Sequence, residues 1–338
     1  MTEVERYADR GRWREFCRTL WYRVPFLRET GIGTCRALDW RAHWTRYQTK
    51  VHLLETRLKV YRMEESGIQT PERTTPRLIV SLTSHPPRVA ESYAAVYSLL
   101  TQSLKPDKVV LWLAQSQFPC KEHDLPWELL HLRQFGLSIQ WCEDLKALKK
   151  IIPSLKAYPD DTIVLADDDT LYPHNWLEQL YEEHRKNPSF VQAYAAYKVC
   201  SGRDYTTRNW CWGGGKSCSP PYFASSWGGV LYPPHSQHEE VLRTDLAMQL
   251  APYDDELWCW AMRVLKGTTL HTVKDHPKGF VCLHAKEGIT ERARGLDVHT
   301  FLLKAYPRLR KILIEDGYVL PDSLFRSLAG LGEPVRDI

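Results

Sequence analysis

The sequence predicts an α/β fold with a mostly parallel central sheet flanked by helices. Between residues 77 and 187, short apolar segments typical of buried strands alternate with amphipathic segments typical of helices. Such alternation indicates βαβ units. The chain has 338 residues, 43% of them hydrophobic and 25% charged, which suffices for one large domain and an appendage.

The expected elements follow one another from residue 77 onward. They are a strand at 77–83, a helix at 88–102, a strand at 108–114, a helix at 127–135, a strand at 137–143, a short helix at 146–155, a strand at 162–168 and a helix at 174–187. Residues 190–237 are rich in aromatic and small residues and predict loops with short strands. A helix that begins near residue 254, followed by strands at 269–273 and 280–284, completes the domain.

Residues 1–75 differ from the rest of the chain in charge. They contain 15 Lys and Arg against 10 Asp and Glu, whereas the whole chain has a formal net charge of only +4. Apolar residues such as Leu53, Leu54, Leu58 and Tyr61 recur at three- and four-residue spacings, which predicts a helical arm. We therefore expect a helical arm with a polar linker over 1–75, the α/β domain over 76–290 and a helical tail over 291–338.

Several classes of protein are disfavoured. No segment has the 18 or so apolar residues that cross a bilayer, and the N-terminus lacks an apolar stretch with a cleavage site, so we expect a cytoplasmic protein. The nine cysteines are scattered without a Cys-x-x-Cys pair, which favours reduced thiols. Nucleic acid is not an expected partner, because acids are mixed among the bases of the arm and no recognition module is present.

The arm interleaves basic residues with aromatic residues such as Trp13, Trp21, Trp40 and Trp44. This mixture suits peripheral contact with an anionic lipid surface, which would place the protein at the inner face of the membrane. The alternative is that these aromatic residues pack against the α/β domain or a second subunit.

Three carboxylates, Asp167, Asp168 and Asp169, directly follow an apolar strand segment. Two like charges about 5 Å apart repel by roughly 3 kcal/mol at an effective dielectric constant of about 20, so a cation or hydrogen bonds must offset the repulsion. Oxygen ligands suit Mg²⁺ or Mn²⁺. Because side chains alternate in an extended segment, we expect Asp167 and Asp169 on one side and Asp168 on the other. The alternative is a solvated turn in which one Asp caps the next helix.

The segment VLADDDTLYP resembles the Asp-x-Asp motif of GT-A glycosyltransferases, and the order of elements over 77–187 is similar to theirs. The resemblance covers about 76–285 and is nearest to family-2-like enzymes of bacterial surface polysaccharide synthesis. It implies a Rossmann-like GT-A domain that uses Mn²⁺ or Mg²⁺ and moves a sugar from a nucleotide-sugar, with a UDP-sugar favoured, to a glycan or lipid-linked acceptor, with inversion.

The resemblance also implies a donor site at the carboxyl ends of the strands. The residues that would bind the donor are Ser81, Thr83, Arg88, Asp144, Lys149, Asp167 and Asp168. Asp167, Asp169 and His284 would be the metal ligands. Lys149 and its neighbour Lys150 would reach the diphosphate, and for both the alternative is a solvated helix face. For His284 the alternative is a hydrogen-bonded structural role.

A second carboxylate pair, Asp254 and Asp255, begins a predicted helix. Its position resembles that of the family's catalytic carboxylate residue. An inverting transfer needs a carboxylate to accept the proton of the acceptor hydroxyl. We expect Asp255 to be this base, with Asp254 as the alternative. Both residues also suit a helix N-terminus, where Asp caps the helix or offsets its dipole.

Aromatic and glycine residues suggest a substrate-facing surface. Gly228 and Gly229 permit close backbone approach, and Trp227, Trp258 and Trp260 offer rings that stack on sugars. The alternative for the tryptophans is a place in the core.

Two other functions fit the sequence less well. A nucleotidyltransferase would also hold Mg²⁺ on a Rossmann-like sheet, but it usually has a glycine-rich loop after the first strand, where this chain has SHPPR. The other is an inactive carbohydrate-binding scaffold, which the intact acidic clusters disfavour.

Overall fold

The protein is described here by a computed structural model. The described residues are 32–74, 76–198, 210–212, 215–218, 220–274, 279–283 and 302–316, with the backbone alone for 32–46, 197–198 and 210–212. The chain divides into two compact units, Met1–Glu55 and Thr56–Ile338.

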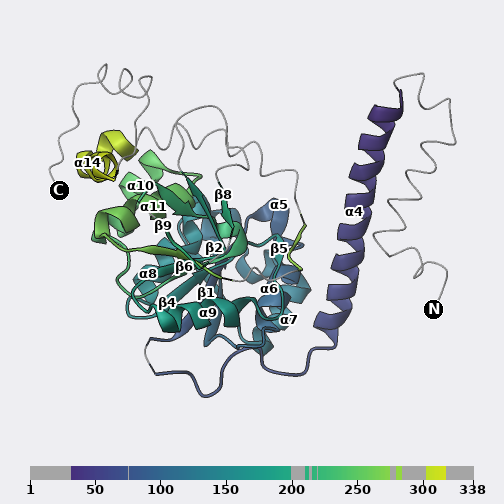
Figure 1. The fold of residues 1–338 in the computed structure, drawn as a ribbon. Helices are drawn as coiled ribbons and strands as arrows, with labels where there is room; N and C mark the ends of the chain where they lie inside the picture. The colour runs from purple at the N-terminus through teal and green to yellow at the C-terminus, as the bar shows by residue number, and fades with distance from the viewer. Residues whose placement is uncertain are drawn as a thin grey trace. The chain divides into compact units, whose positions relative to one another are not determined.

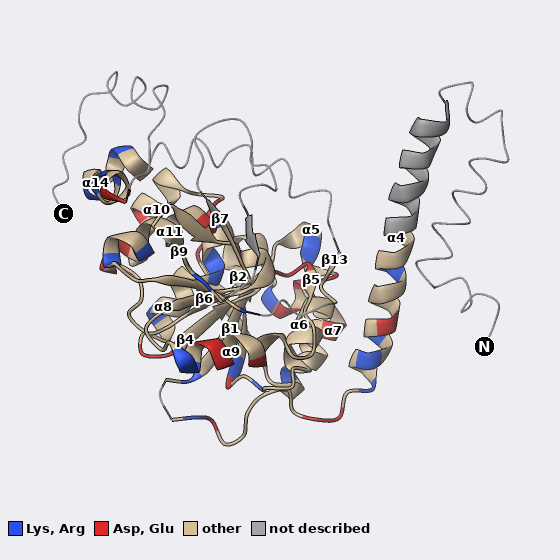
Figure 2. Cartoon of the chain, viewed as in Figure 1, with Lys and Arg blue, Asp and Glu red and all other residues tan. Residues whose placement is uncertain are grey.

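The described part of the N-terminal segment is one long helix, α4 (Ile32–Tyr61). Near its end, Thr56 and Val60 are buried, and Nε of Arg57 lies 2.6 Å from Oε1 of Glu128. Figure 2 shows that acidic and basic residues both occur along the described side chains of this helix. Residues 1–31 of the predicted arm lie outside the described residues.

An eight-stranded sheet forms the centre of the second unit (Figure 1). In spatial order its strands are β3 (Leu137–Cys142), β2 (Lys108–Ala114), β1 (Leu78–Thr83), β4 (Thr162–Leu165), β11 (Val230–Tyr232), β6 (Val191–Ala193), β12 (Leu270–Thr272) and β9 (Ser217–Cys218). The first four strands are mutually parallel, and β6 pairs in parallel with β12. Strand β11 runs antiparallel between β4 and β6.

Helices cover this sheet, and the strands at its centre are therefore apolar along almost their whole length. The helices are α5 (Pro86–Val89), α6 (Tyr93–Leu100), α7 (Trp127–Leu132), α8 (Ile152–Ala157), α9 (Trp176–Lys186), α10 (Thr244–Leu250), α11 (Asp255–Lys266) and α14 (Pro307–Glu315). All four residues of β4 are buried, as are the first five of β1. Buried parallel strands are typical of this architecture. The mostly parallel sheet flanked by helices confirms the predicted α/β class, in the Rossmann-like form that the GT-A resemblance implies.

Two elements near the carboxylate triplet differ from the expectation. The helix expected over 88–102 is split into α5 and α6, because Pro86 and Pro87 start a separate short helix. The strand expected over 162–168 ends at Leu165, and Asp168 and Asp169 form a turn before β5 (Thr170–Leu171). Strand β5 pairs with β13 (Val281–Cys282) in a separate two-stranded sheet.

A smaller three-stranded sheet is formed within residues 190–237, the region whose structure was hardest to predict from the sequence. It consists of β10 (Tyr222–Ala224), β7 (Ala195–Lys198) and β8 (Trp210–Trp212). Both pairings are antiparallel. The segment 190–237 thus contains short strands, as its composition predicts.

Among the described residues, no helix is both long and apolar enough to cross a bilayer.

Candidate active site

The loops that follow β1 and β4 meet because these two strands are parallel neighbours in the sheet. Oγ of Ser84, the residue after β1, donates a hydrogen bond to Oδ2 of Asp168 at 2.5 Å. Nη1 of Arg88 on α5 lies 3.0 Å from Oδ2 of Asp169 and 3.5 Å from Oδ1 of Asp168. The first loop therefore supplies both a hydroxyl and a cation to the carboxylate triplet.

The three carboxylates of the triplet differ in exposure. The side chain of Asp167 is 25% exposed, that of Asp169 13% and that of Asp168 8%. Strict alternation of sides is not observed, since the turn lets one guanidinium, that of Arg88, reach both Asp168 and Asp169. Asp167 and Asp169 remain the two most accessible carboxylates.

Asp168 is the buried member of the triplet. Burial raises the pKa of its carboxyl group, while the hydrogen bond from Ser84 and the charge of Arg88 act in the opposite direction. The loop after β1 thus holds Asp168 through Ser84 and Arg88, and the carboxylate of Asp168 does not face solvent.

Lys150 joins the triplet to the second carboxylate pair. Its Nζ atom lies 2.8 Å from Oδ1 of Asp167 and 3.0 Å from Oδ2 of Asp255. Burial lowers the pKa of the ammonium, but the charges of Asp167 and Asp255 outweigh it, so the pKa is raised well above its ordinary value. Lys150 is therefore a permanent cation between two carboxylates.

The backbone around Lys150 is fixed to β1. Lys150 ends a short 3₁₀ helix, η4 (Lys146–Lys150), and its carbonyl oxygen accepts a 2.6 Å hydrogen bond from Oγ of Ser81. Ser81 is fully buried, and its hydroxyl also lies 2.7 Å from Oγ of Ser154. The structure places Ser81 beneath the site, where it supports η4.

Asp254 and Asp255 have different surroundings. The side chain of Asp254 caps α11, accepting a 3.0 Å hydrogen bond from the amide of Leu257. Asp255 is buried at the start of the helix and pairs with Lys150. Burial raises the pKa of Asp255, and Lys150 opposes that rise. The predicted N-cap is thus Asp254, and the carboxylate joined to the triplet is Asp255.

Asp144 and Lys149 lie together beside the first loop. Nζ of Lys149 is 3.7 Å from Oδ1 of Asp144, 3.1 Å from Oε1 of Gln117 and 3.3 Å from the carbonyl oxygen of Ser84. Lys146 forms a second ion pair with Asp144. Lys149 and Lys150 are both buried, so the alternative of a solvated helix face is wrong for this segment. Burial lowers the pKa of Lys149, and Asp144 opposes that effect.

The remaining predicted donor residue, Thr83, is the last residue of β1. Its hydroxyl donates a 2.8 Å hydrogen bond to the carbonyl oxygen of Trp112 on the neighbouring strand. Thr83 is half-buried, and it contributes to the pairing of β1 with β2.

The three tryptophans of the predicted substrate surface have different places. Trp258 and Trp260 are buried, and their indole nitrogens donate to the carbonyl oxygens of Val241 and Pro220. Both rings belong to the core, where a sugar has no access. Trp227 is half-buried, and its ring centroid lies 5.2 Å from that of Phe280.

The two glycines of this region approach the indole of Trp176. The carbonyl oxygen of Gly228 accepts a 2.7 Å hydrogen bond from Nε1 of Trp176. Gly229 has a φ of +91°, and a Cβ atom there would lie 2.4 Å from Cζ2 of the same ring. The close contact with Trp176 accounts for glycine at position 229, whereas at Gly228 a Cβ atom would lie 3.0 Å from Cβ of Tyr194.

The donor set of the triplet is compatible with a divalent cation. Among the described residues, no group of three or more His, Cys, Asp and Glu side chains is arranged to hold a metal ion, and His284 lies outside them. Mg²⁺, however, usually takes one or two protein carboxylates and completes its shell with water and phosphate. The hard oxygens of Asp167 and Asp169 fit that requirement.

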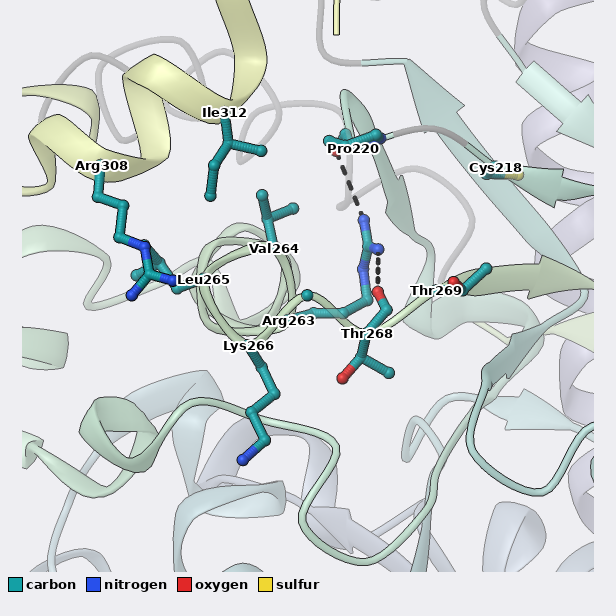
Figure 3. A pocket seen from close by; sticks show the side chains of 11 residues that line it. Cys218, Pro220, Arg263, Val264, Leu265, Lys266, Thr268, Thr269, Arg308 and Ile312 are labelled. Carbon is teal, nitrogen blue, oxygen red and sulfur yellow. Dashed lines mark hydrogen bonds between the residues drawn. The ribbon is translucent and has the colours of Figure 1, made fainter. Parts of the chain in front are cut away.

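A cavity of about 240 Å³ lies at the other end of α11. Arg263, Lys266 and Arg308 are among its lining residues (Figure 3). Arg263 donates to the carbonyl oxygens of Thr268 and Tyr222 at 2.8 and 2.7 Å, so its guanidinium already holds the chain together. At 1.5 Å per helical residue, Arg263 is about 12 Å along α11 from Asp255, and the cavity is separate from the acidic site.

Three residues of the site were absent from the sequence prediction. They are Ser84, Gln117 and Glu256. Ser84 and Gln117 follow the ends of β1 and β2, so the rule that ligands bind beyond the carboxyl ends of strands points to them. Glu256 has no such signal, and the place of Lys150 between two carboxylates has none either, because both depend on which groups the fold brings together.

Solved structures that are similar to this chain include two enzymes or their fragments. One is the inositol-1-phosphate CTP transferase from T. maritima, with 10% identity, a TM-score of 0.39 and a match that covers 68% of this chain and 97% of that chain. The other is TarS 1–349 from S. aureus in complex with UDP, with 11% identity, a TM-score of 0.40 and a match that covers 59% of this chain and 58% of that chain. The likeness is one of fold alone. No protein-family model matches the sequence, and the search of curated proteins finds no match.

Proposed function

We propose that this chain is a glycosyltransferase that moves a sugar from a nucleotide-sugar, with a UDP-sugar favoured, to a glycan or lipid-linked acceptor. The observation that carries the proposal is the position of the carboxylate triplet at the carboxyl end of β4, where the buried ammonium of Lys150 connects it to Asp255. Ligands of open α/β sheets bind at this edge. The site thus combines an anionic centre for a cation with a second carboxylate for proton transfer.

The donor diphosphate would lie over Asp167 and Asp169. In this proposal these two carboxylates would hold Mg²⁺ or Mn²⁺, and such an ion would supply positive charge for a departing diphosphate. Arg88, whose side chain is 23% exposed, supplies a second positive charge at the same place. Asp168 has a supporting role, since Ser84 and Arg88 hold it on the inner side of the turn.

Asp255 would act as the base. The acceptor oxygen forms a bond to the anomeric carbon, the bond from that carbon to the diphosphate oxygen breaks, and the acceptor proton passes to the carboxylate. Lys150 favours the ionised carboxylate of Asp255, because its charge opposes the burial that raises the pKa of this group. An attack on the face opposite the leaving group inverts the anomeric centre.

A thermal-shift experiment tests the donor site. UDP, GDP, CDP and CMP are added with and without Mn²⁺, because a ligand that binds the native state raises the melting temperature. We expect a nucleoside diphosphate to stabilise the wild type only when Mn²⁺ is present. Asp169→Asn should remove that shift, whereas the exposed Asp160→Asn should retain it. An equal shift in EDTA would contradict the metal-dependent site.

A product assay separates the two enzyme classes. A glycosyltransferase releases the nucleoside diphosphate from a nucleotide-sugar, whereas a nucleotidyltransferase joins a nucleoside triphosphate to a phosphorylated acceptor and releases pyrophosphate. We expect nucleoside diphosphate from a panel of nucleotide-sugars with Mn²⁺. Pyrophosphate from a nucleoside triphosphate would instead support the nucleotidyltransferase, and binding without either product would support the scaffold.

A further inference from the structure

Helix α4 presents large apolar side chains to solvent near its C-terminal end. Leu54 is 59% exposed, Leu58 58% and Tyr61 71%, and Tyr47 is also exposed. The ring of Tyr61 lies 6.0 Å from that of Trp127 on α7, which is itself half exposed. Contiguous exposed apolar side chains of this kind mark interaction surfaces.

These residues repeat with the period of a coiled coil. Tyr47, Val51, Leu54, Leu58 and Tyr61 follow one another at spacings of four, three, four and three residues, so Val51 and Leu58 occupy a positions and the other three d positions of a heptad. Trp40 and Trp44 continue the series toward the start of α4. A helix with a sustained seven-residue apolar repeat packs along another helix with the same repeat, whereas a flat surface offers no corresponding repeat.

The opposite side of the helix is already occupied by the chain itself. Thr56 and Val60 are buried and hold f and c positions, which point away from the a and d positions. At a g position, Arg57 pairs with Glu128. The end of α4 therefore buries one side within the chain and leaves its heptad side exposed.

We propose that the heptad side of α4 pairs in parallel with the same side of a second copy of this chain. The charges that flank the seam favour this orientation. In a parallel pair the g residue of one helix faces the e residue of the next heptad on the other, which brings Lys50 to Glu55 of the second copy, twice per dimer. An antiparallel pair centred on Leu54 and Leu58 instead brings Glu55 to Glu55 and Arg57 to Arg57.

A lipid surface is the competing occupant, and the charge pattern disfavours it. Helices that lie on anionic membranes carry mainly Lys and Arg on their polar side. In the exposed part of α4, Glu55 flanks the seam among the basic residues Lys50, Arg57 and Lys59, and Arg57 is already paired with Glu128. The acidic residue suits a helix pair better than an anionic headgroup layer.

Sedimentation equilibrium of the full chain tests the proposal. We expect a monomer–dimer equilibrium in which Leu54→Glu raises the dissociation constant by at least about 100-fold, because it places a charge in the seam. Lys59→Glu, at an exposed b position, is the matched control and should change it by no more than about twofold. Melting curves of each variant establish that the monomer remains folded.

A charge swap tests the orientation. Lys50→Glu and Glu55→Lys should each weaken the dimer by about 5- to 10-fold, and the double variant should restore it. A monomeric wild type at every accessible concentration would overturn the proposal, as would a dimer that Leu54→Glu leaves unchanged. Flotation with phosphatidylserine vesicles that depends on Leu54 in a monomeric chain would assign the surface to lipid instead.

Discussion

Asp167 and Asp255 share one buried ammonium, that of Lys150, with separations of 2.8 and 3.0 Å. One carboxylate follows β4 and the other begins α11, so the lysine fixes the distance between two segments that are far apart in the sequence. The buried carboxylate of Asp255 and the partly buried carboxylate of Asp167 repel each other, and a cation between them offsets that cost. The charges of the candidate site therefore also contribute to the stability of the fold.

The first prediction concerns this coupling. Lys150→Met leaves Asp167 and Asp255 without their shared cation, and we expect the free energy of unfolding to fall by about 3–5 kcal/mol, as measured by urea denaturation. The double variant Lys150→Met with Asp255→Asn should recover part of this loss, because the buried charge of Asp255 is gone.

The matched control for this prediction is Lys156→Met, at an exposed position of the neighbouring helix α8. Its effect should stay within about 0.5 kcal/mol. If the effects of Lys150→Met and Asp255→Asn simply add, the two residues are not energetically coupled and the interpretation of the bridge is wrong.

The second prediction separates Asp255 from Asp254. Under the proposed function, Asp255→Asn should lower kcat by about 100-fold or more, the scale of a lost general base, with little change in nucleotide affinity. Asp254→Asn should lower kcat far less, because Asn retains the N-cap hydrogen bond to Leu257. Initial rates and nucleotide titrations measure both quantities.

The opposite ranking of these two variants would make Asp254 the base. Loss of nucleotide affinity in Asp255→Asn, with kcat preserved, would place Asp255 in the donor site.

Much of the fold was predictable from the sequence because its signals are local. The apolar runs of β1, β2 and β4 are long enough to identify strands without knowledge of their neighbours. The prolines of α5 and the turn at Asp168 and Asp169 are also local features. They shift the ends of the neighbouring helix and strand by several residues from the predicted positions, and the ends of elements are the least predictable part of a fold.

The site was predictable only in part, because its contacts link distant segments. The triplet and Asp255 carry a signal in their spacing and position, whereas the burial of Lys150 becomes evident only when both carboxylates are in place. Trp258 and Trp260 illustrate the opposite case. Their aromatic side chains suggest stacking on sugars, but on α11 both rings lie on the side that packs into the core.

The third prediction concerns Gly229. Gly229→Ala should lower the free energy of unfolding by about 3 kcal/mol or more, since the residue has a φ of +91° and the new Cβ would lie 2.4 Å from Trp176. Gly267→Ala is the matched control: its φ is +83°, but no atom lies within 4 Å of the added Cβ. It should cost only about 1–2 kcal/mol, the penalty of the backbone conformation. Equal losses in urea denaturation would contradict the close contact with Trp176.

The fourth prediction is a pH dependence that Glu256 creates. Its Oε1 accepts hydrogen bonds from the amide and hydroxyl of Ser226 at 2.7 and 2.9 Å and from the hydroxyl of Ser225 at 3.2 Å. Burial, followed by the charges of Asp255 and Asp254, raises the pKa of the carboxyl group from 4.5 to about 7. The folded chain therefore keeps a proton that the unfolded chain has released between these two pH values.

Because the folded state binds more protons in this range, the contribution of Glu256 to stability falls as the pH rises from about 4.5 to about 7. Glu256→Gln stays neutral and retains an oxygen that accepts from the amide of Ser226. We expect the variant to match the wild type near pH 4.5 and to exceed its free energy of unfolding by up to about 3 kcal/mol above pH 7. Urea denaturation across this range measures the difference, with the exposed Glu315→Gln as the control that should follow the wild type. A difference that does not change with pH would show that Glu256 is already ionised in the folded chain at acidic pH, and that the serine hydrogen bonds outweigh its burial.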